Sequence, residues 1–215
     1  MDGNGRWAQA RGWPRIAGHK AGAETVRRVV EAAPELGIGT LTLYAFSSDN
    51  WKRPQEEVAA LFRLFGRYMR QECAKLQEQG VRFEVIGRRD RLNGPLVALI
   101  EETERATGQG SRLHLRVAVD YSSREAIAAA VAAGARDSLQ ISSALGPDVD
   151  LLIRTSGEQR LSDFLLWESA YAEFCFTSVA WPDFGAADLR AALDEFRGRE
   201  RRFGATAPAR LQALR

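Results

Sequence analysis

Residues 40–54 read TLTLYAFSSDNWKRP, and this stretch joins three kinds of local structure. The β-branched and aromatic residues of 40–46 predict a short buried strand. The polar residues 47–54 predict a loop. A helix should follow over 56–79, because its apolar residues recur in steps of three and four. That apolar stripe comprises Val58, Leu61, Phe62, Phe65, Met69, Cys73 and Leu76.

The rest of the chain repeats this alternation of strand and helix. Segments 81–86, 113–120 and 149–154 predict further strands, and segments 24–36, 95–107, 124–136 and 188–202 predict helices. Repeated strand–helix–strand order favours an α/β fold in which helices flank a central, mainly parallel sheet. No low-complexity linker interrupts residues 1–215, and this length suits a single domain with a sizeable core.

The composition excludes several classes of protein. The 30 basic and 28 acidic residues leave a formal net charge of +2, so no global field favours nucleic acid and any anion site must be local. Cys73 and Cys175 are too few for a disulfide framework, which predicts buried free thiols in a reducing cytoplasm. No apolar run approaches the roughly 20 residues of a membrane span, and Asp2 and Arg6 leave no room for a signal peptide.

Basic residues gather in three polar segments, 1–22, 47–54 and 154–162. Two of them follow predicted strands, and ligands of parallel sheets bind at the carboxyl ends of strands. The cations are Arg6, Arg15, His19, Arg53, Arg154 and Arg160, accompanied by Ser47, Ser162 and several glycines. Arginine forks bind phosphate oxygens, and glycine admits backbone N–H groups to an anion. The segments therefore predict a site for two phosphate or diphosphate groups, with 18–22 as a loop that cradles an anion before a helix.

A divalent metal would further stabilise a diphosphate leaving group in such a site. Asp2, Glu158 and Glu173 lie in or near the polar segments, and oxygen ligands with water suit Mg²⁺. No spacing of cysteine and histidine indicates zinc. The sequence therefore favours Mg²⁺ as the cofactor.

Each of these features also has an ordinary structural explanation. A single loop arginine is usually solvated, and only the recurrence in three segments favours a site. His114 fits the polar side of a strand, and His19 alone fits a helix start. The apolar stripe on 56–79 fits the core, although one helix face can serve a ligand pocket as well. Tryptophans usually pack in the interior, and Trp51, inside a polar loop, is the exception.

An ordered series of motifs runs through nearly the whole chain, from Asp2 to Gly204. The series is MDGNGRWA, GHKAG, LYAFSSDNWKRP with Glu57, DLLIRTSGE with Arg160 and Ser162, FLLWESAYAEFCFT, WPDF and RERRFG. In content and order it resembles the motifs of the cis-prenyltransferases, the Z-type prenyl diphosphate synthases that include undecaprenyl diphosphate synthase. This resemblance implies a hydrophobic tunnel beside the sheet.

The resemblance also implies the reaction. An allylic diphosphate, geranyl or farnesyl, would lose its diphosphate, and isopentenyl diphosphate would attack the cationic carbon through its terminal alkene carbon. Loss of a proton would leave a new Z double bond, and repeated rounds would lengthen the chain within the tunnel. The implied protein is thus a Mg²⁺-dependent transferase of isoprenoid biosynthesis.

Individual residues take roles by the same resemblance. Asp2, Ser47 and Asn50 would be catalytic, and Asp2 and Glu173 would be the metal-linked carboxylates. The allylic substrate would be bound by Gly3, Asn4, Gly5, Arg6, Arg15, His19 and Arg53, and Trp7 would also contact substrate. The diphosphate of isopentenyl diphosphate would be bound by Arg154, Arg160 and Ser162. Phe46, Trp51 and Glu57 would lie at or close over the substrate. Arg202 and Gly204 of the C-terminal Arg-x-Gly would reach the partner subunit's site in a homodimer.

The chain also departs from the family pattern. The family has a strand that runs into the first Met-Asp, so either that strand lies before Met1 or Asp2 hangs on a frayed terminus. Asp120 stands where asparagine is expected, and the segment between Tyr121 and Asp148 is shorter than in the long-chain enzymes. Product length therefore stays open. A lipid product implies peripheral contact with the inner face of the membrane.

Two other functions stay open at this point. The first is a non-catalytic, prenyl-diphosphate-binding subunit of a hetero-oligomeric prenyltransferase, and Asp2, Asn50, Arg154 and Arg160 argue against it because such partners lose them. The second is a nucleotide-phosphate enzyme on another parallel-sheet fold. The chain contains neither GxxxxGK[ST] nor GxGxxG, which counts against that function.

Overall fold

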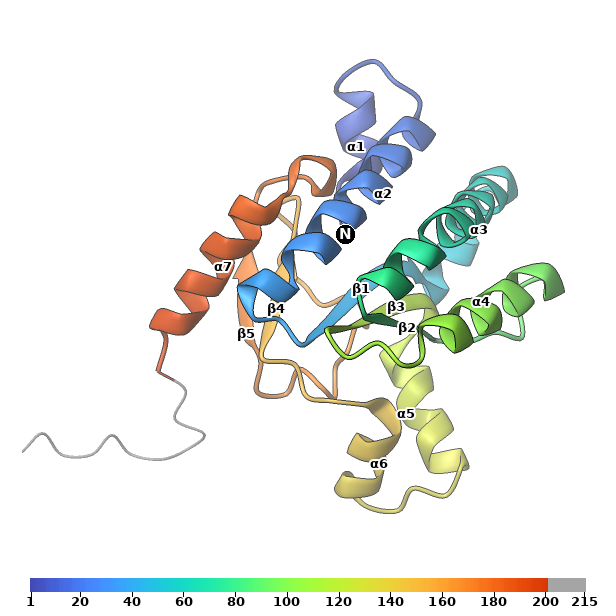
Figure 1. Cartoon of the computed structure of the whole chain (residues 1–215), viewed down its shortest axis with the longest axis vertical. Helices are drawn as coiled ribbons and strands as arrows, with labels where there is room; N and C mark the ends of the chain where they lie inside the picture. Colours follow the sequence, from blue (N-terminus) through green and yellow to red (C-terminus); the bar gives the residue numbers. More distant parts are fainter. Residues whose placement is uncertain (201–215) are drawn as a thin grey trace, which may run out of the picture.

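The computed structural model describes residues 1–200, and a parallel sheet with helices on both faces forms its centre (Figure 1). Its three strands, hydrogen-bonded in the order β1-β3-β2, are β1 (Thr40–Ser47), β3 (Leu113–Tyr121) and β2 (Val81–Ile86). A second parallel pair, β4 (Leu151–Arg154) and β5 (Glu173–Phe176), lies beside them. The predicted single α/β domain with a parallel sheet is confirmed.

Helices cover the two faces unequally. The face that bears Leu43 and Val117 is covered by α2 (Arg15–Ala32), α3 (Gln55–Glu78) and α4 (Gly94–Thr107). On the opposite face, α5 (Ser123–Ala132) packs through Ala126 near Tyr44 and Ala118, and α6 (Ser138–Leu145) lies against α5. The remaining elements are α1 (Asn4–Gln9), α7 (Ala186–Gly198) and the 3-10 turns η1 (Pro34–Leu36), η2 (Ser48–Lys52) and η3 (Trp181–Asp183).

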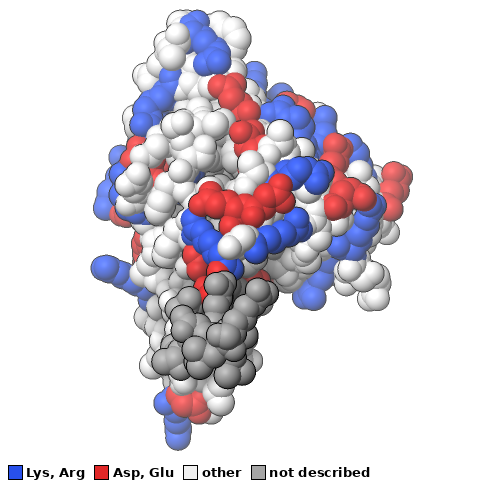
Figure 2. Space-filling model, turned by 90° about the vertical axis from the view of Figure 1, so that its left-hand side faces the viewer, with Lys and Arg blue, Asp and Glu red and all other residues white. Residues whose placement is uncertain are grey.

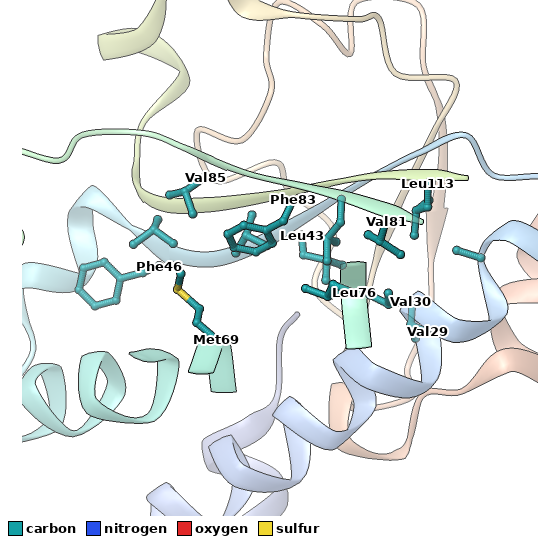
Figure 3. Close-up of a cluster of buried hydrophobic side chains, with 14 of the residues drawn as sticks. Val29, Val30, Leu43, Phe46, Met69, Leu76, Val81, Phe83, Val85 and Leu113 are labelled. Carbon is teal, nitrogen blue, oxygen red and sulfur yellow. The ribbon is translucent and has the colours of Figure 1, made fainter. Parts of the chain in front are cut away.

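The main core lies between the sheet and the helices α2 and α3. Figure 3 shows Val30 of α2, Leu76 of α3, and Leu43 and Phe83 of the sheet gathered in this layer. Successive strand residues point to opposite faces, so only alternate residues of each strand reach it. Burial of one such large side chain contributes about 1.5–3 kcal/mol to folding.

Helix α2 begins earlier than the sequence predicts, and this overturns one expectation. The segment 18–22 lies inside α2, which starts at Arg15 after Pro14, so the predicted cradle loop there is wrong. A Cβ on Gly18 would lie 1.8 Å from the Asn4 carbonyl oxygen, and one on Gly22 would lie 2.4 Å from Asn4 Oδ1. The two glycines therefore serve the close approach of the opening segment to α2, and they do not form a loop.

The cysteines and the surface charges bear on two expectations drawn from the composition. Cys73 and Cys175 are free, as predicted, but both are partly exposed, so the prediction of buried thiols is wrong. Figure 2 shows basic and acidic side chains interspersed on the face that it displays, in keeping with the small net charge. Among residues 1–200, no helix has the length and apolar character needed to cross a bilayer.

Candidate active site

Asp2 is firmly held at the carboxyl end of β4. Its N–H donates to Thr155 Oγ1 at 2.9 Å, and its carbonyl oxygen accepts from the N–H of Trp181 at 2.9 Å. Its Oδ2 accepts from Arg154 Nε at 3.1 Å and Nη2 at 2.8 Å. The expectation of a frayed Asp2 is wrong, because hydrogen bonds hold its backbone on both sides.

Arg154 connects Asp2 to the loop that follows β4. Its Nη1 donates to Ser162 Oγ at 2.9 Å and to the carbonyl oxygen of Arg160. The loop turns sharply, since Ser156, Ser162 and Asp163 have positive φ angles of 71°, 52° and 60°. This turn brings residues eight apart in sequence onto one guanidinium.

Glu158 bridges Arg6 of the opening segment and Arg160 of its own loop. Its Oε1 accepts from Arg6 at 2.7 Å, and its Oε2 pairs with Arg160. The hydrogen bond from Arg160, followed by that from Arg6, holds the pKa of Glu158 below its usual value. The side chains of Arg6 and Arg160 are 59% and 62% exposed, so both guanidinium groups remain accessible to an anion from solvent.

A second carboxylate, Glu57 of α3, bridges another pair of arginines. It accepts from Arg15 at 3.4 Å and from Arg53 at 3.3 Å. His19 lies beside this group, and burial, together with the charge of Arg53, lowers its pKa to about 4. His19 is therefore neutral near pH 7. A Cβ on Gly5 would lie 2.6 Å from Arg15 Nη1, so the opening segment is in close contact with this group.

The loop after β1 forms the 3-10 turn η2 and is fixed by its own side chains. Ser47 N–H donates to Asn50 Oδ1 at 3.2 Å, and Ser47 Oγ accepts from the N–H of Asp49 at 3.2 Å. The Trp51 ring packs on Phe46 and Phe62, with centroids 5.5 and 5.3 Å apart. The predicted residues Ser47, Asn50, Phe46 and Trp51 thus occupy one compact turn at the end of β1.

An apolar cavity adjoins the polar groups. Asn4 and His19 line it at the site, and Asn4 Oδ1 and His19 Nε2 are buried without a hydrogen-bond partner among residues 1–200. The cavity lies between α2, α3 and the sheet. Its apolar lining includes Val26, Val30, Leu43, Phe46, Phe62, Phe65, Met69, Leu76 and Val117. The α3 stripe therefore serves both core and cavity, the two uses that the sequence left open.

A family model described as "Putative undecaprenyl diphosphate synthase" matches residues 1–204. The chain belongs to this prenyltransferase family. It is 60% identical over 213 residues to Isoprenyl transferase 1 of Bradyrhizobium diazoefficiens, covering 95% of this chain and 87% of that protein. The fold, the family and the enzyme class that the motif series implies are thereby confirmed, and none of the comparisons favours the non-catalytic alternative.

Two solved structures share the fold of this prenyltransferase. Lavandulyl diphosphate synthase from Lavandula x intermedia, in complex with dimethylallyl diphosphate, is 36% identical with a TM-score of 0.89 and 95% coverage of both chains. A probable undecaprenyl diphosphate synthase from Campylobacter jejuni is 32% identical with a TM-score of 0.80, covering 86% of this chain and 92% of that one.

One predicted site residue of the prenyltransferase, Glu173, lies apart from these groups. Glu173 pairs with Arg199 at 2.7 Å and lies opposite Leu151, at the far end of the β4–β5 pair from Arg154. The backbones of Glu173 and Arg154 are thus separated by about three strand residues, or roughly 10 Å. Trp7 packs edge-on against Trp13 at 5.7 Å. Arg202 and Gly204 lie outside the described residues.

Asp2 is suited to be a carboxylate ligand of Mg²⁺. Mg²⁺ in proteins commonly uses one or two carboxylates and completes its shell with water and substrate phosphate oxygens. Asp2 is 41% exposed, and only its Oδ2 is bonded to Arg154. Residues 1–200 contain no group of three or more histidine, cysteine, aspartate or glutamate side chains placed to hold a metal ion. The donor set therefore suits a metal held jointly with a bound diphosphate.

Arg91 and Asp120 support the turn η2 that carries Asn50 and Trp51, a role that the sequence did not predict. Asp120, at the end of β3, is fully buried and accepts from Arg91 Nε at 2.8 Å and from Ser48 Oγ at 3.1 Å. The Arg91 guanidinium lies 5.4 Å from the centre of the Trp51 ring. The pair thus connects β3 to the turn η2. In the sequence, the only indication of this role was the aspartate at position 120, where the family pattern has asparagine.

Proposed function

We propose that this prenyltransferase condenses isopentenyl diphosphate with an allylic diphosphate and makes a Z-configured polyprenyl diphosphate. One observation carries the proposal: an apolar cavity is lined by His19, which lies beside Arg15 and Arg53, and by Asn4, which shares helix α1 with Arg6. A diphosphate with a hydrocarbon tail needs this combination. The unpartnered Asn4 Oδ1 and His19 Nε2 support the same conclusion, because buried polar atoms in proteins normally have partners.

In the absence of substrate, two bridging carboxylates hold the arginines of the site in ion pairs. Glu57 holds Arg15 and Arg53, and Glu158 holds Arg6 and Arg160. We assign Arg15, Arg53 and His19 to the allylic diphosphate, and Arg154, Arg160 and Ser162 to isopentenyl diphosphate. A diphosphate would replace the carboxylate as the partner of the arginines, since arginine binds both groups with the same fork.

Asp2 would hold Mg²⁺ together with oxygens of a diphosphate, and the metal would neutralise negative charge as the leaving group departs. The cations of the opening segment and of α2 would share that task. Fixed donors aimed at developing charge usually supply the largest catalytic contribution. Within one chain, Glu173 is less suited than Asp2 to be a metal-linked carboxylate, because Arg199 already pairs with it.

The condensation balances without an external oxidant or reductant. The allylic carbon–oxygen bond breaks, and its electron pair leaves with diphosphate. The terminal alkene carbon of isopentenyl diphosphate forms the new carbon–carbon bond, and loss of a proton from its second carbon leaves the Z double bond. Ser47 and Asn50 lie in one turn at the end of β1, and we place them beside the reacting atoms.

We also propose a homodimer and a cytoplasmic protein with peripheral contact at the membrane. The stacked rings of Phe174 and Phe176 on β5 are 36% and 39% exposed, which supports an interface on that strand. The free Cys73 and Cys175 support a reducing compartment. Sedimentation of the full chain would test the dimer directly.

The function is tested by incubating the purified protein with Mg²⁺, labelled isopentenyl diphosphate and, in parallel, dimethylallyl, geranyl or farnesyl diphosphate. We expect extension products that are abolished by EDTA. Asp2→Ala should lower kcat by about 10²- to 10³-fold, as removal of one transition-state contact commonly does.

The variant Arg154→Ala/Arg160→Ala should raise the KM for isopentenyl diphosphate more than that for the allylic substrate. Arg88→Ala, an exposed loop change outside the site, is the control and should leave both KM values unaltered. Lack of product with every starter, from protein that still unfolds cooperatively, would refute the proposed reaction.

A further inference from the structure

Charged side chains stand in the wall of the apolar cavity, where α2 and α3 face each other. Arg27 and Glu31 of α2, and Glu72 and Lys75 of α3, line the cavity beside its apolar residues. Charges are costly in apolar surroundings unless they are paired or reach solvent. Neither substrate binding nor the chemistry proposed above uses these four residues, so their place in this wall requires another explanation.

The charges pair across the gap between the two helices. Arg27 donates from Nε to Glu72 Oε2 at 3.3 Å and from Nη2 to Glu72 Oε1. Lys75 Nζ donates to Glu31 Oε1, one helical turn farther from the active site. Tyr68 Oη donates to Glu24 Oε1 at 2.7 Å, one turn nearer to it. We name these six residues, Glu24, Arg27, Glu31, Tyr68, Glu72 and Lys75, the seam ladder.

The seam ladder joins α2 to α3 at three places along one side of the cavity. Its positions follow a helical step of three or four residues on both helices, so its three rungs stack along one face of each. Nearer the active site, a further ion pair, between Arg15 and Glu57, joins the same two helices. The side chains of Arg27 and Glu72 are 37% and 20% exposed, so their charged ends reach solvent while their stems face the cavity.

We propose that the seam ladder limits the length of the prenyl product, an inference that rests on the proposed function. The hydrocarbon chain grows from the diphosphate site into the cavity. When the cavity is full, a further isoprene unit requires α2 and α3 to separate, and the paired rungs oppose that separation. Partly exposed ion pairs are weak singly and can open, so the ladder favours release over extension without blocking extension outright.

The test sizes the products of wild type, Arg27→Ala, Glu72→Ala and the double variant, each with farnesyl diphosphate, isopentenyl diphosphate and Mg²⁺. Both single variants should lengthen the most abundant product by at least one isoprene unit. The double variant should lengthen it no further, because residues that act as a pair give non-additive effects. Glu72→Gln repeats the test with a side chain of nearly unchanged shape, should an alanine variant fail to fold.

Glu35→Ala and Arg112→Ala provide the matched control. These residues form an exposed ion pair that does not line the cavity, so their loss should leave product length unchanged. Raising the salt concentration offers a test on the unaltered protein, because salt screens exposed pairs. Salt should lengthen the wild-type product and leave that of the double variant unchanged.

Three results would overturn the inference. Products of wild-type length, or shorter, from the rung variants would show that the ladder does not limit growth. Equal lengthening by Glu35→Ala would show that the effect is not specific to the cavity wall. Lack of product from the wild type with any starter would overturn the proposed function as well, whereas unchanged lengths from active variants would overturn the length limit alone.

Discussion

At Gly18 a missing side chain lets the opening segment lie against α2. An added methyl group would lie 1.8 Å from the carbonyl oxygen of Asn4, a residue that lines the cavity at the active site. Atoms cannot approach so closely, so either the backbone of α2 or that of the opening segment would have to move.

Gly18→Ala should therefore destabilise the fold by about 2–3 kcal/mol or more and misplace Asn4. Urea unfolding monitored by circular dichroism would measure the free energy of unfolding. Gly39→Ala is the control, since an added Cβ there meets nothing within 4 Å, and its effect should stay within about 0.5 kcal/mol. Equal effects of the two changes would contradict this account.

His19 makes stability depend on pH. Burial is the main cause that lowers its pKa from 6.5 to about 4, followed by the charge of Arg53, while Glu57 acts in the opposite direction. As pH falls from about 6.5 to about 4, the unfolded chain takes up a proton that the folded protein does not. The unfolded state is therefore favoured, and the stability due to neutral His19 is lost across this window.

The expected loss in the free energy of unfolding is on the order of 2–3 kcal/mol between pH 6.5 and pH 4. His19→Gln removes the titrating group, so its unfolding free energy should fall less over the same range. Urea titrations of both proteins at several pH values give the comparison. Parallel curves for the two proteins would rule out His19 as the source.

An ion pair between the partly exposed Arg91 and the buried Asp120 joins β3 to the turn η2. Asp120 adopts a positive φ of 50° and is fully buried, and both of its carboxylate oxygens are hydrogen-bonded. Arg91 supplies most of those bonds and also lies over Trp51. Asp120 and Arg91, which lie outside the turn in sequence, thus help to hold the turn that carries Ser47 and Asn50.

Arg91→Ala should destabilise the protein by about 3 kcal/mol, because it leaves a buried carboxylate without its cation. Arg88→Ala, in the same loop but with exposed partners, should cost less than about 1 kcal/mol. Arg91→Ala should also reduce kcat/KM for condensation by freeing Trp51. Chemical unfolding and steady-state kinetics on both variants measure these effects, and similar losses from the two would contradict the role given to Arg91.

Substrate should stabilise the whole fold, because it would bind several distant segments at once. The site joins the opening segment, the turn after β1 and the loop after β4. A ligand that binds only the folded state, at a hundred times its dissociation constant, adds about 2.7 kcal/mol. Farnesyl diphosphate with Mg²⁺ should therefore raise the Tm by several degrees.

EDTA should remove part of that rise, and Asp2→Ala should show only the part that does not depend on metal. Differential scanning fluorimetry with and without Mg²⁺ measures both effects. An equal rise for Asp2→Ala and wild type, in each condition, would show that Asp2 does not hold the metal.

Local patterns in the chain determined the elements and much of the site's composition. The stripe on 56–79 predicted α3 to within one residue at each end, because helical periodicity is a property of neighbours in sequence. The strands and the polar segments at their carboxyl ends followed for the same reason. The helices α1 and α6 and the strand β5 were not predicted. The glycines of 18–22 indicate a loop by composition, yet they serve contact between α2 and Asn4.

The packing of distant segments decided which charges far apart in sequence meet. Arg6 and Glu158 are 152 positions apart, and Asp2 and Arg154 are equally distant, so no local pattern could pair them. The same holds for the rungs between α2 and α3, and for Glu173, which lies with Arg199 at the other end of its strand from Arg154. A sequence determines which side chains a segment presents, whereas the packing of segments against one another determines what each side chain touches.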